Sequence, residues 1–234
     1  RELLALIFDG TRRDTESSGI GYLRPVADLP ALPGLVSATT QQVFASVLRI
    51  LGLHGYRENG RNSSREGTCP APVREYLEKV AEVHGLDAEE LLTGITDGLV
   101  SVYLDEGWQI LPGKAKAPLT VDAGDGTLHR CTVCTFLHMH PSAGVCTNAG
   151  CAGGRLVQID QEEAGRSYYR ALAQEEPRRI ATAELTAQTR PAEVQRRRQR
   201  LFQGITLKEL KESKLADPLD VLSVTTTMEA GVDI

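Results

Sequence analysis

Four of the five cysteines lie close together, in the segment CTVCTFLHMHPSAGVCTNAGC. Two residues separate Cys131 from Cys134, and four residues separate Cys146 from Cys151. Two pairs of cysteines, each carried by a turn, supply the tetrahedral set of thiolates that Zn²⁺ prefers. Four protein ligands leave no coordination position open. The spacing therefore predicts a structural zinc site, which contributes roughly 10–16 kcal/mol to the fold of a small module.

Two other interpretations of these cysteines stay open. A pair of disulfide bonds would suit a secreted protein, but the odd total of five cysteines and the tight two-residue turn disfavour it. A catalytic zinc site would take a ligand from a nearby histidine and leave one position for water. The nearby histidines are His129, His138 and His140. One of them would also replace Cys151 if the four-residue gap were too wide.

A hairpin is expected to carry the first cysteine pair. Strand-like pieces at 119–122 and 127–130 flank the turn sequence Ala-Gly-Asp-Gly. After the cysteines, 155–159 is predicted to be a strand and 166–174 a short helix. We therefore expect residues 119–165 to form a zinc-binding hairpin module.

Residues 30–118 have the pattern of a helical insert. Apolar residues at helical spacing predict helices over 37–51 and 73–84, and Asp87 has the spacing of a capping residue before a third helix. Two strand-like pieces follow, at 100–104 and 109–111. Helices followed by a short hairpin would suit a winged-helix-like module, whereas an insert without that fold is the favoured interpretation.

The two ends of the chain carry apolar runs that do not alternate with polar residues, which suits buried strands. A strand at 3–8 and a helix at 11–23 are predicted near the start. A strand at 179–185, a helix at 191–203 and a strand at 219–224 are predicted near the end. This order favours an α/β fold with a doubly wound parallel sheet, built from 1–29 and 166–234, in which 4–8 and 221–224 share one sheet.

The ends and the charge of the chain bear on its class. The chain begins with Arg1 and stops within an apolar segment, so we expect an internal piece of a longer protein. The net charge of −5 argues against nucleic-acid binding by the whole surface, although residues 178–200 hold seven arginines and two glutamates. No apolar run reaches the ~18 residues of a membrane helix, so we expect a cytoplasmic protein without membrane contact.

Both ends also resemble a known family. DVLSVTTTMEAGVDI at 220–234 resembles a motif between the last strands of the second RecA-like lobe in superfamily 2 (DEAD/DEAH-type) helicases. RIATAELTAQTRPAEVQRRRQRLFQG at 179–204 resembles the strand–helix pair before that motif, and LLALIFDGTRRDTESSGIGYL at 3–23 is similar to the opening of the lobe. A four-cysteine insert between such blocks resembles the large bacterial DISARM-type defence helicases and MrfA-like repair helicases.

The resemblance implies a fragment of an ATP-dependent nucleic-acid helicase or translocase, with DNA as the favoured substrate. Its partner would be the first RecA-like lobe of the same protein. The nucleic-acid contacts that it implies are Gln188, Arg197, Thr225, Thr226 and Thr227. Gly231 and Asp233 would line the cleft for ATP. The sequence holds no phosphate-binding G-x-x-x-x-G-K-[ST] loop and no Asp-Glu pair for Mg²⁺, so we expect ATP hydrolysis only in the full-length parent.

Two interpretations from other classes are kept. The first is a zinc-containing nucleic-acid-binding module without nucleotide hydrolysis. The second is an α/β protein with a structural zinc, in which the three threonines have no role. A Gln-x-x-Gly-Arg-x-Gly-Arg-like sequence encoded shortly after Ile234, and a phosphate loop encoded upstream, would favour the helicase.

Overall fold

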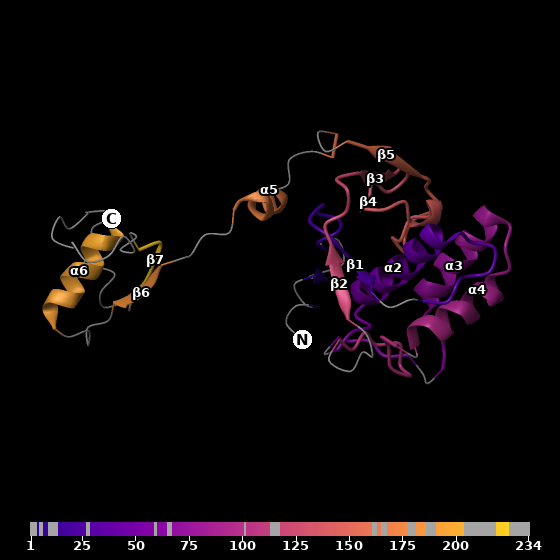
Figure 1. Ribbon diagram of the computed structural model, residues 1–234, viewed down its shortest axis with the longest axis horizontal. Coiled ribbons are helices and arrows are strands. Elements are labelled where there is room, and N and C mark those ends of the chain that lie inside the picture. Colours follow the sequence, from indigo (N-terminus) through magenta and orange to yellow (C-terminus); the bar gives the residue numbers. More distant parts are fainter. Residues whose placement is uncertain are drawn as a thin grey trace. The chain divides into compact units, whose positions relative to one another are not determined.

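The computed structural model of the protein describes residues 4, 7–8, 14–26, 29–58, 60–64, 67–100, 102–112, 118–160, 163–164, 168–176, 181–185, 191–203 and 219–224. The chain divides into two compact units, 1–175 and 176–234 (Figure 1). The predicted segment boundaries at 29/30 and 118/119 fall inside the first unit. Among the helices that the structure describes, none has both the length and the apolar character that a membrane span requires.

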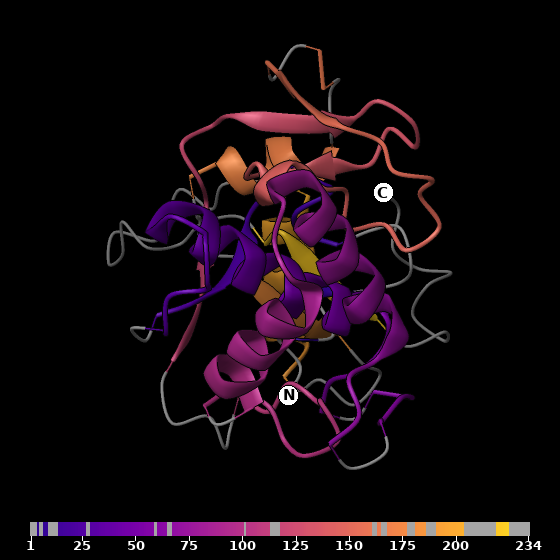
Figure 2. The ribbon, with the colours of Figure 1, turned by 90° about the vertical axis from the view of Figure 1, so that its right-hand side faces the viewer.

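Three helices form the centre of the first unit: α2 (Ser37–Leu53), α3 (Ala71–His84) and α4 (Ala88–Ile95). The middle of α2 is buried on all sides, and α3 lies against it in both ribbon views (Figures 1 and 2). Asp87 caps α4, because its carboxylate accepts hydrogen bonds from the amides of Glu89 and Glu90 at 2.9 and 3.0 Å. The predicted helices and the capping role of Asp87 are confirmed.

The first apolar run of the chain belongs to the core of these helices. Leu4 and Ile7 are helical, and the Phe8 amide donates to the Leu4 carbonyl at 3.1 Å. Phe8 is 3% exposed, and its ring packs so closely on α2 that a Cβ at Gly52 would lie 2.4 Å from it. The strand predicted over 3–8, and its place in one sheet with 221–224, is wrong for these three residues. A run of six apolar residues does not by its pattern separate a buried helical turn from a strand.

The helix predicted over 11–23 is also wrong for the residues described. The chain turns at 15–19 and then forms β1 (Tyr22–Pro25), which pairs antiparallel with β2 (Leu119–Asp122). The Asp14 carboxylate accepts from the Ser17 amide at 2.8 Å, and the Asp14 amide donates to the Ser17 hydroxyl at 3.0 Å, a reciprocal pair that closes a single turn. Gly19, with φ of +68°, then takes the left-handed conformation that glycine tolerates.

The cysteine segment lies in a second antiparallel sheet. Its order is β4 (Leu137–His138), β3 (Leu128–Cys131) and β5 (Leu156–Ile159). The strand predicted at 155–159 is confirmed, but the hairpin predicted between 119–122 and 127–130 is wrong, because β2 and β3 belong to different sheets. Left-handed glycines at 124 and 126 turn the chain away from β2 before β3 begins.

The strand pair predicted over 100–104 and 109–111 is reduced to isolated bridges. Residues Thr96–Val100 form a π-helix, and Ile110 bridges to Leu104 and to Arg57. Trp108, 1% exposed with φ of +62°, fills the core between them. The winged-helix-like interpretation stays a prediction.

The second unit contains a parallel pair of strands. β6 (Thr182–Leu185) runs beside β7 (Val221–Val224) in the register Thr182↔Val221 to Leu185↔Val224, and α6 (Ala192–Phe202) lies between them in sequence. These three predicted elements are confirmed, as is the short helix α5 (Tyr168–Gln174) at the end of the first unit. The described residues of this unit contain one two-stranded sheet, and the doubly wound sheet stays a prediction.

Candidate metal centre

The four clustered cysteines converge on one point. Their sulfur atoms all lie within 4.8 Å of one another. The Sγ atoms of Cys131 and Cys151 are 3.5 Å apart, as are those of Cys134 and Cys146. Four sulfurs at the usual Zn–S distance of about 2.3 Å from one tetrahedral ion would be about 3.8 Å apart. The cluster can therefore hold one metal ion, as the spacing predicts.

The cluster forms a small core of its own. Cys131, Cys146 and Cys151 are buried, and Phe136 and Leu156 pack around them. The Cys131 amide donates to the Phe136 carbonyl at 3.0 Å, which closes the turn that carries the first pair. Two sulfur atoms accept backbone amides, Cys146 Sγ from Asn148 and Cys151 Sγ from Gly154. Such donors favour the thiolate form that binds metal.

The thiols differ in how readily they lose a proton. Burial acts to raise the pKa of Cys134, but hydrogen bonds from Asn148, from the Phe136 amide and from the neighbouring thiols outweigh it and lower the pKa to about 7. Burial raises the pKa of Cys146 and of Cys131. Metal binding must displace protons from the thiols of Cys146 and Cys131, so the affinity for metal is expected to fall at acidic pH.

Two residues outside the ligand set shape this site. Thr135 occupies the left-handed conformation, with φ of +60°, at the end of the first cysteine turn. Gly154 lies against the cluster, since a Cβ at this position would be 2.2 Å from Cys131 Sγ. Sequence reasoning missed Gly154, although a glycine pair at 153–154, one residue beyond the last cysteine, was a signal for close approach of the backbone.

Two of the three nearby histidines, His138 and His140, have polar contacts away from the cysteines. His138 Nδ1 lies 3.0 Å from Arg49 Nη1, and His140 Nδ1 accepts the Ser142 amide at 3.1 Å. Burial lowers the pKa of both rings, that of His140 to about 3, so both are neutral at pH 7. Among the residues described, no group of possible metal ligands includes a histidine. This finding supports the four-cysteine set over a histidine-containing one.

A buried ion network joins α2 to the segment that carries the cysteines. Arg49, 2% exposed, holds Asp14 through two hydrogen bonds of 2.7 and 3.1 Å and Glu16 through an ion pair of 2.9 Å. Its guanidinium also donates to the Leu137 carbonyl at 2.9 Å and lies 4.4 Å from the centre of the Phe136 ring. No pattern in the sequence indicates that these side chains meet.

The pKa values of the two carboxyl groups in this network are shifted in opposite directions. Burial acts to raise the pKa of Asp14, but the charge and hydrogen bonds of Arg49 outweigh burial, so this pKa is lowered. Burial raises the pKa of Glu16 to about 7 against the opposing charge of Arg49. Asp14 is thus the anionic partner of Arg49, and Glu16 is the member that takes up a proton near neutral pH.

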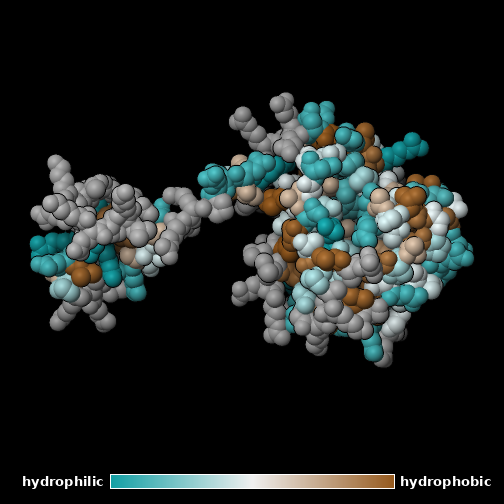
Figure 3. All heavy atoms as spheres, viewed as in Figure 1, coloured by the Kyte–Doolittle hydropathy of each residue, from teal (hydrophilic) through white to brown (hydrophobic). Residues whose placement is uncertain are grey.

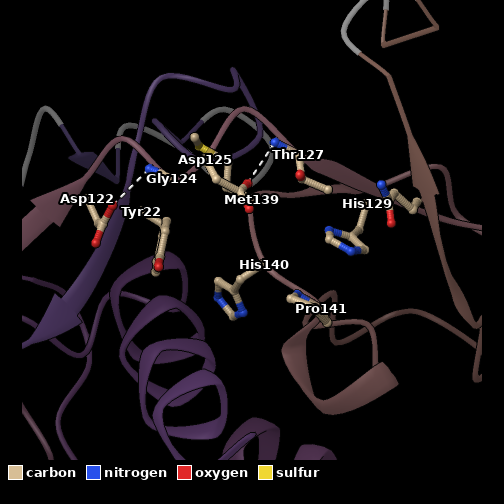
Figure 4. A pocket seen from close by; sticks show the side chains of 10 residues that line it. Tyr22, Asp122, Gly124, Asp125, Thr127, His129, Met139, His140 and Pro141 are labelled. Carbon is tan, nitrogen blue, oxygen red and sulfur yellow. Dashed lines mark hydrogen bonds between the residues drawn. The ribbon is translucent and has the colours of Figure 1, made fainter. Parts of the chain in front are cut away.

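A cavity of about 500 Å³ opens between β1, β3 and the segment after β4 (Figure 4). Its walls carry the Asp122 and Asp125 carboxyl groups and the rings of Tyr22, His129 and His140. The His140 ring lies between Tyr22 and Pro141 in this view. No lysine or arginine is among the described residues that line the cavity, and its carboxylates would repel phosphate.

The predicted nucleic-acid and nucleotide contacts fall in two groups. Arg197 is exposed on α6, beside exposed Arg196 and Arg200, and hydrophilic atoms lie over part of the second unit in Figure 3. Arg198, in contrast, donates to the Glu184 carbonyl of β6. The remaining predicted contacts lie outside the described residues: Gln188, Thr225, Thr226, Thr227, Gly231 and Asp233.

Comparisons with known proteins add no further constraint. No family model, no curated protein and no solved structure matches the chain. The candidate metal centre rests on the geometry of its four cysteines.

Proposed function

We propose that the four cysteines bind one structural Zn²⁺. The observation that carries this proposal is the convergence of four sulfurs at separations that fit one tetrahedral ion. Thiolates are soft ligands that select zinc over Mg²⁺ or Ca²⁺, and a complete four-sulfur shell leaves no position for water or substrate. The ion would hold the turns at Cys131–Cys134 and Cys146–Cys151 together rather than take part in catalysis.

Elemental analysis of the purified chain tests this assignment. We expect about one zinc per chain, and loss of that zinc in Cys131→Ser. Cys69→Ser is the matched control, because Cys69 is buried in the helical core, and burial raises the pKa of its thiol to about 11. Zinc that is absent from the wild-type chain, or retained in Cys131→Ser, would contradict the proposal.

We further propose that the chain contributes the second motor lobe of an ATP-dependent nucleic-acid translocase that acts on DNA. Supporting this, β6 and β7 are parallel with a helix between them, and β7 ends at Val224, directly before the three threonines. In open α/β sheets, ligands bind beyond the carboxyl ends of the strands. ATP and Mg²⁺ would bind between this lobe and the first RecA-like lobe. The remaining support is the resemblance of the sequence to the helicase motifs.

The second candidate is a zinc-containing binding module without nucleotide hydrolysis. It would use the helices of the first unit, but the exposed side chains of α3 and α4 are largely acidic. They include Glu75, Glu78, Glu82, Glu89 and Glu90. Arg74 on the same face is paired with Glu89 at 2.9 Å. Such a surface repels phosphate, so the exposed arginines of α6 are the better candidates for nucleic-acid contact.

Binding of single-stranded DNA, followed by fluorescence anisotropy at several salt concentrations, tests where contact occurs. Replacing Arg196, Arg197 and Arg200 together by alanine should weaken binding and reduce the salt slope by about 0.7 for each phosphate that is no longer neutralised. Arg74→Ala is the control on the acidic face. Unchanged binding in the triple variant would remove α6 as the nucleic-acid contact. The coding sequence on both sides decides between motor and module, since the module requires neither a phosphate loop nor an arginine motif.

A further inference from the structure

The segment between the two cysteine pairs contains a left-handed turn. Ser142, Ala143 and Gly144 have φ of +49°, +52° and +81° in succession. Residues other than glycine rarely adopt this conformation. Where they do, the surrounding structure holds the backbone in place. Ser142 and Ala143 are buried, so solvent does not satisfy their polar groups.

Four side chains from two helices hold this turn. From α2, Gln42 Oε1 accepts the Ala143 amide at 3.1 Å, and Ser46 Oγ lies 2.6 Å from Ser142 Oγ. From α3, the Tyr76 hydroxyl donates to the Ser142 carbonyl at 3.2 Å. His84 Nε2 lies 3.0 Å from the Ala143 carbonyl. The groove between α2 and α3 thus supplies partners for the amide and carbonyl groups of the turn.

The same turn leads directly to the third cysteine. Ala143 and Val145 are each 5% exposed and belong to the helical core, whereas Cys146 belongs to the cysteine cluster. The chain crosses from one core to the other within a single residue. α3 also reaches the fourth cysteine, because Lys79 Nζ donates to the Cys151 carbonyl at 3.1 Å. Both members of the second cysteine pair are therefore tied to α3.

We propose that the groove between α2 and α3 is part of the metal centre, and that formation of the left-handed turn and binding of the metal are coupled. This inference rests on the proposed zinc site. Metal–sulfur distances tolerate changes of about 0.2 Å, so a relaxed turn would carry Cys146 out of the tetrahedron. Tyr76 and Ser46 are accordingly positioning residues for the metal, although neither contacts it.

Coupling has a reciprocal consequence. If the turn favours metal binding, the metal must favour the turn to the same extent. Without metal, the hydrogen bonds from α2 and α3 alone oppose the unfavourable backbone of Ser142 and Ala143. The Ala143 amide should then open more often and exchange its hydrogen faster in the metal-free protein than in the zinc-bound protein.

The experiment compares zinc affinities of full-chain variants by competition with a chromophoric chelator. Tyr76→Phe and Ser46→Ala each remove hydroxyl contacts to the turn, and we expect each to weaken zinc binding roughly two- to twelve-fold. Tyr103→Phe is the matched control, since the Tyr103 hydroxyl bonds to Val26 and Pro118 instead. Its affinity should equal that of the wild type.

Two readouts separate positioning from general stability. The Co²⁺-substituted variants should show altered visible bands, because the sulfur geometry changes, and zinc should slow hydrogen exchange at the Ala143 amide. A lower melting temperature with unchanged zinc affinity in Tyr76→Phe and Ser46→Ala would overturn the coupling. Equal exchange at Ala143 with and without zinc would also overturn it. A wild-type chain that binds no zinc would instead refute the metal assignment itself.

Discussion

Replacing Gly154 by alanine is the sharpest test of the metal centre. A Cβ at this position would lie 2.2 Å from Cys131 Sγ and 3.0 Å from the Val133 amide nitrogen. Contacts below 3.0 Å do not occur at a real Cβ, so either the sulfur or the backbone must move. Both neighbours are constrained, because the Cys131 amide is bonded to the Phe136 carbonyl and the Gly154 amide donates to Cys151 Sγ.

The size of the effect follows from the metal geometry. A carbon and a sulfur atom need well over 3 Å, so Cys131 Sγ and the backbone at residue 154 must separate by about 1 Å or more, whereas metal–sulfur distances tolerate about 0.2 Å. Cys131 would then no longer be a ligand. Structural zinc contributes roughly 10–16 kcal/mol through four ligands, so one ligand represents about 2.5–4 kcal/mol. Because 1.4 kcal/mol is a tenfold change, Gly154→Ala should weaken zinc binding by about two to three orders of magnitude.

Competition titration against a chromophoric zinc chelator measures this weakening, and elemental analysis after dialysis gives the retained metal. Gly150→Ala is the first control, because a Cβ there meets no atom within 4 Å and zinc affinity should not change. Gly153→Ala is the second, since its Cβ also meets nothing but its φ of +90° strains any side chain. It isolates backbone strain from the clash with Cys131. Affinity within about threefold of wild type in Gly154→Ala would refute the placement of Gly154 against the sulfur.

Three further outcomes are expected. Thr135→Gly should stabilise the zinc-bound chain by up to about 1 kcal/mol in urea unfolding, because glycine relieves the left-handed backbone at φ of +60°; a loss of stability would contradict this. Arg49→Met should destabilise by about 3–5 kcal/mol, since it leaves the Asp14 and Glu16 carboxyl groups buried without their cation; a change below about 1 kcal/mol would show that the network is not formed. Burial lowers the pKa of His140 to about 3, so the unfolded chain binds one proton more than the folded chain between about pH 6.5 and 3, and the stability from this group falls as the pH drops. His140→Gln should reduce the slope of unfolding free energy against pH by up to about 1.4 kcal/mol per pH unit between about pH 4 and 6, and parallel curves for the two proteins would contradict it.

Local patterns predicted the helices and the cysteine cluster well. α2 and α3 could be predicted because each repeats apolar residues at helical spacing over several turns, a signal that lies within one element. Asp87 caps α4 by accepting hydrogen bonds from the amides of Glu89 and Glu90, which follow it closely in sequence. A short turn separates the two cysteines of each pair, so the spacing limits how far apart the two sulfurs of a pair can lie. Each of these features depends on residues that are close in sequence.

Features set by distant residues were missed. Leu4 and Ile7 are helical and Phe8 packs on Gly52, a contact that no pattern within the run reveals. β2 pairs with β1 rather than with β3, although β3 is nearer in sequence. The partners of Arg49 come from segments 35 and 88 residues away, and a single buried arginine on a helix carries no sign of them.

These contacts between distant residues bear differently on the proposed zinc site and on the proposed motor lobe. Three sets of contacts join residues 14–25, the helices and the cysteine segment into one unit. They are the pairing of β1 with β2, the hydrogen bonds of Arg49, and the contacts in the groove between α2 and α3. The four-cysteine cluster is thus tied to the helical core by hydrogen bonds with α2 and α3, and is not carried by an independent hairpin. The motor proposal, in contrast, has structural support in the parallel pair β6 and β7, whereas residues 1–29 belong to the first unit and not to the unit that holds this pair. We therefore expect that removal of the proposed zinc disturbs the helices of the first unit and leaves the proposed DNA contact of α6 unchanged, because the two depend on different units.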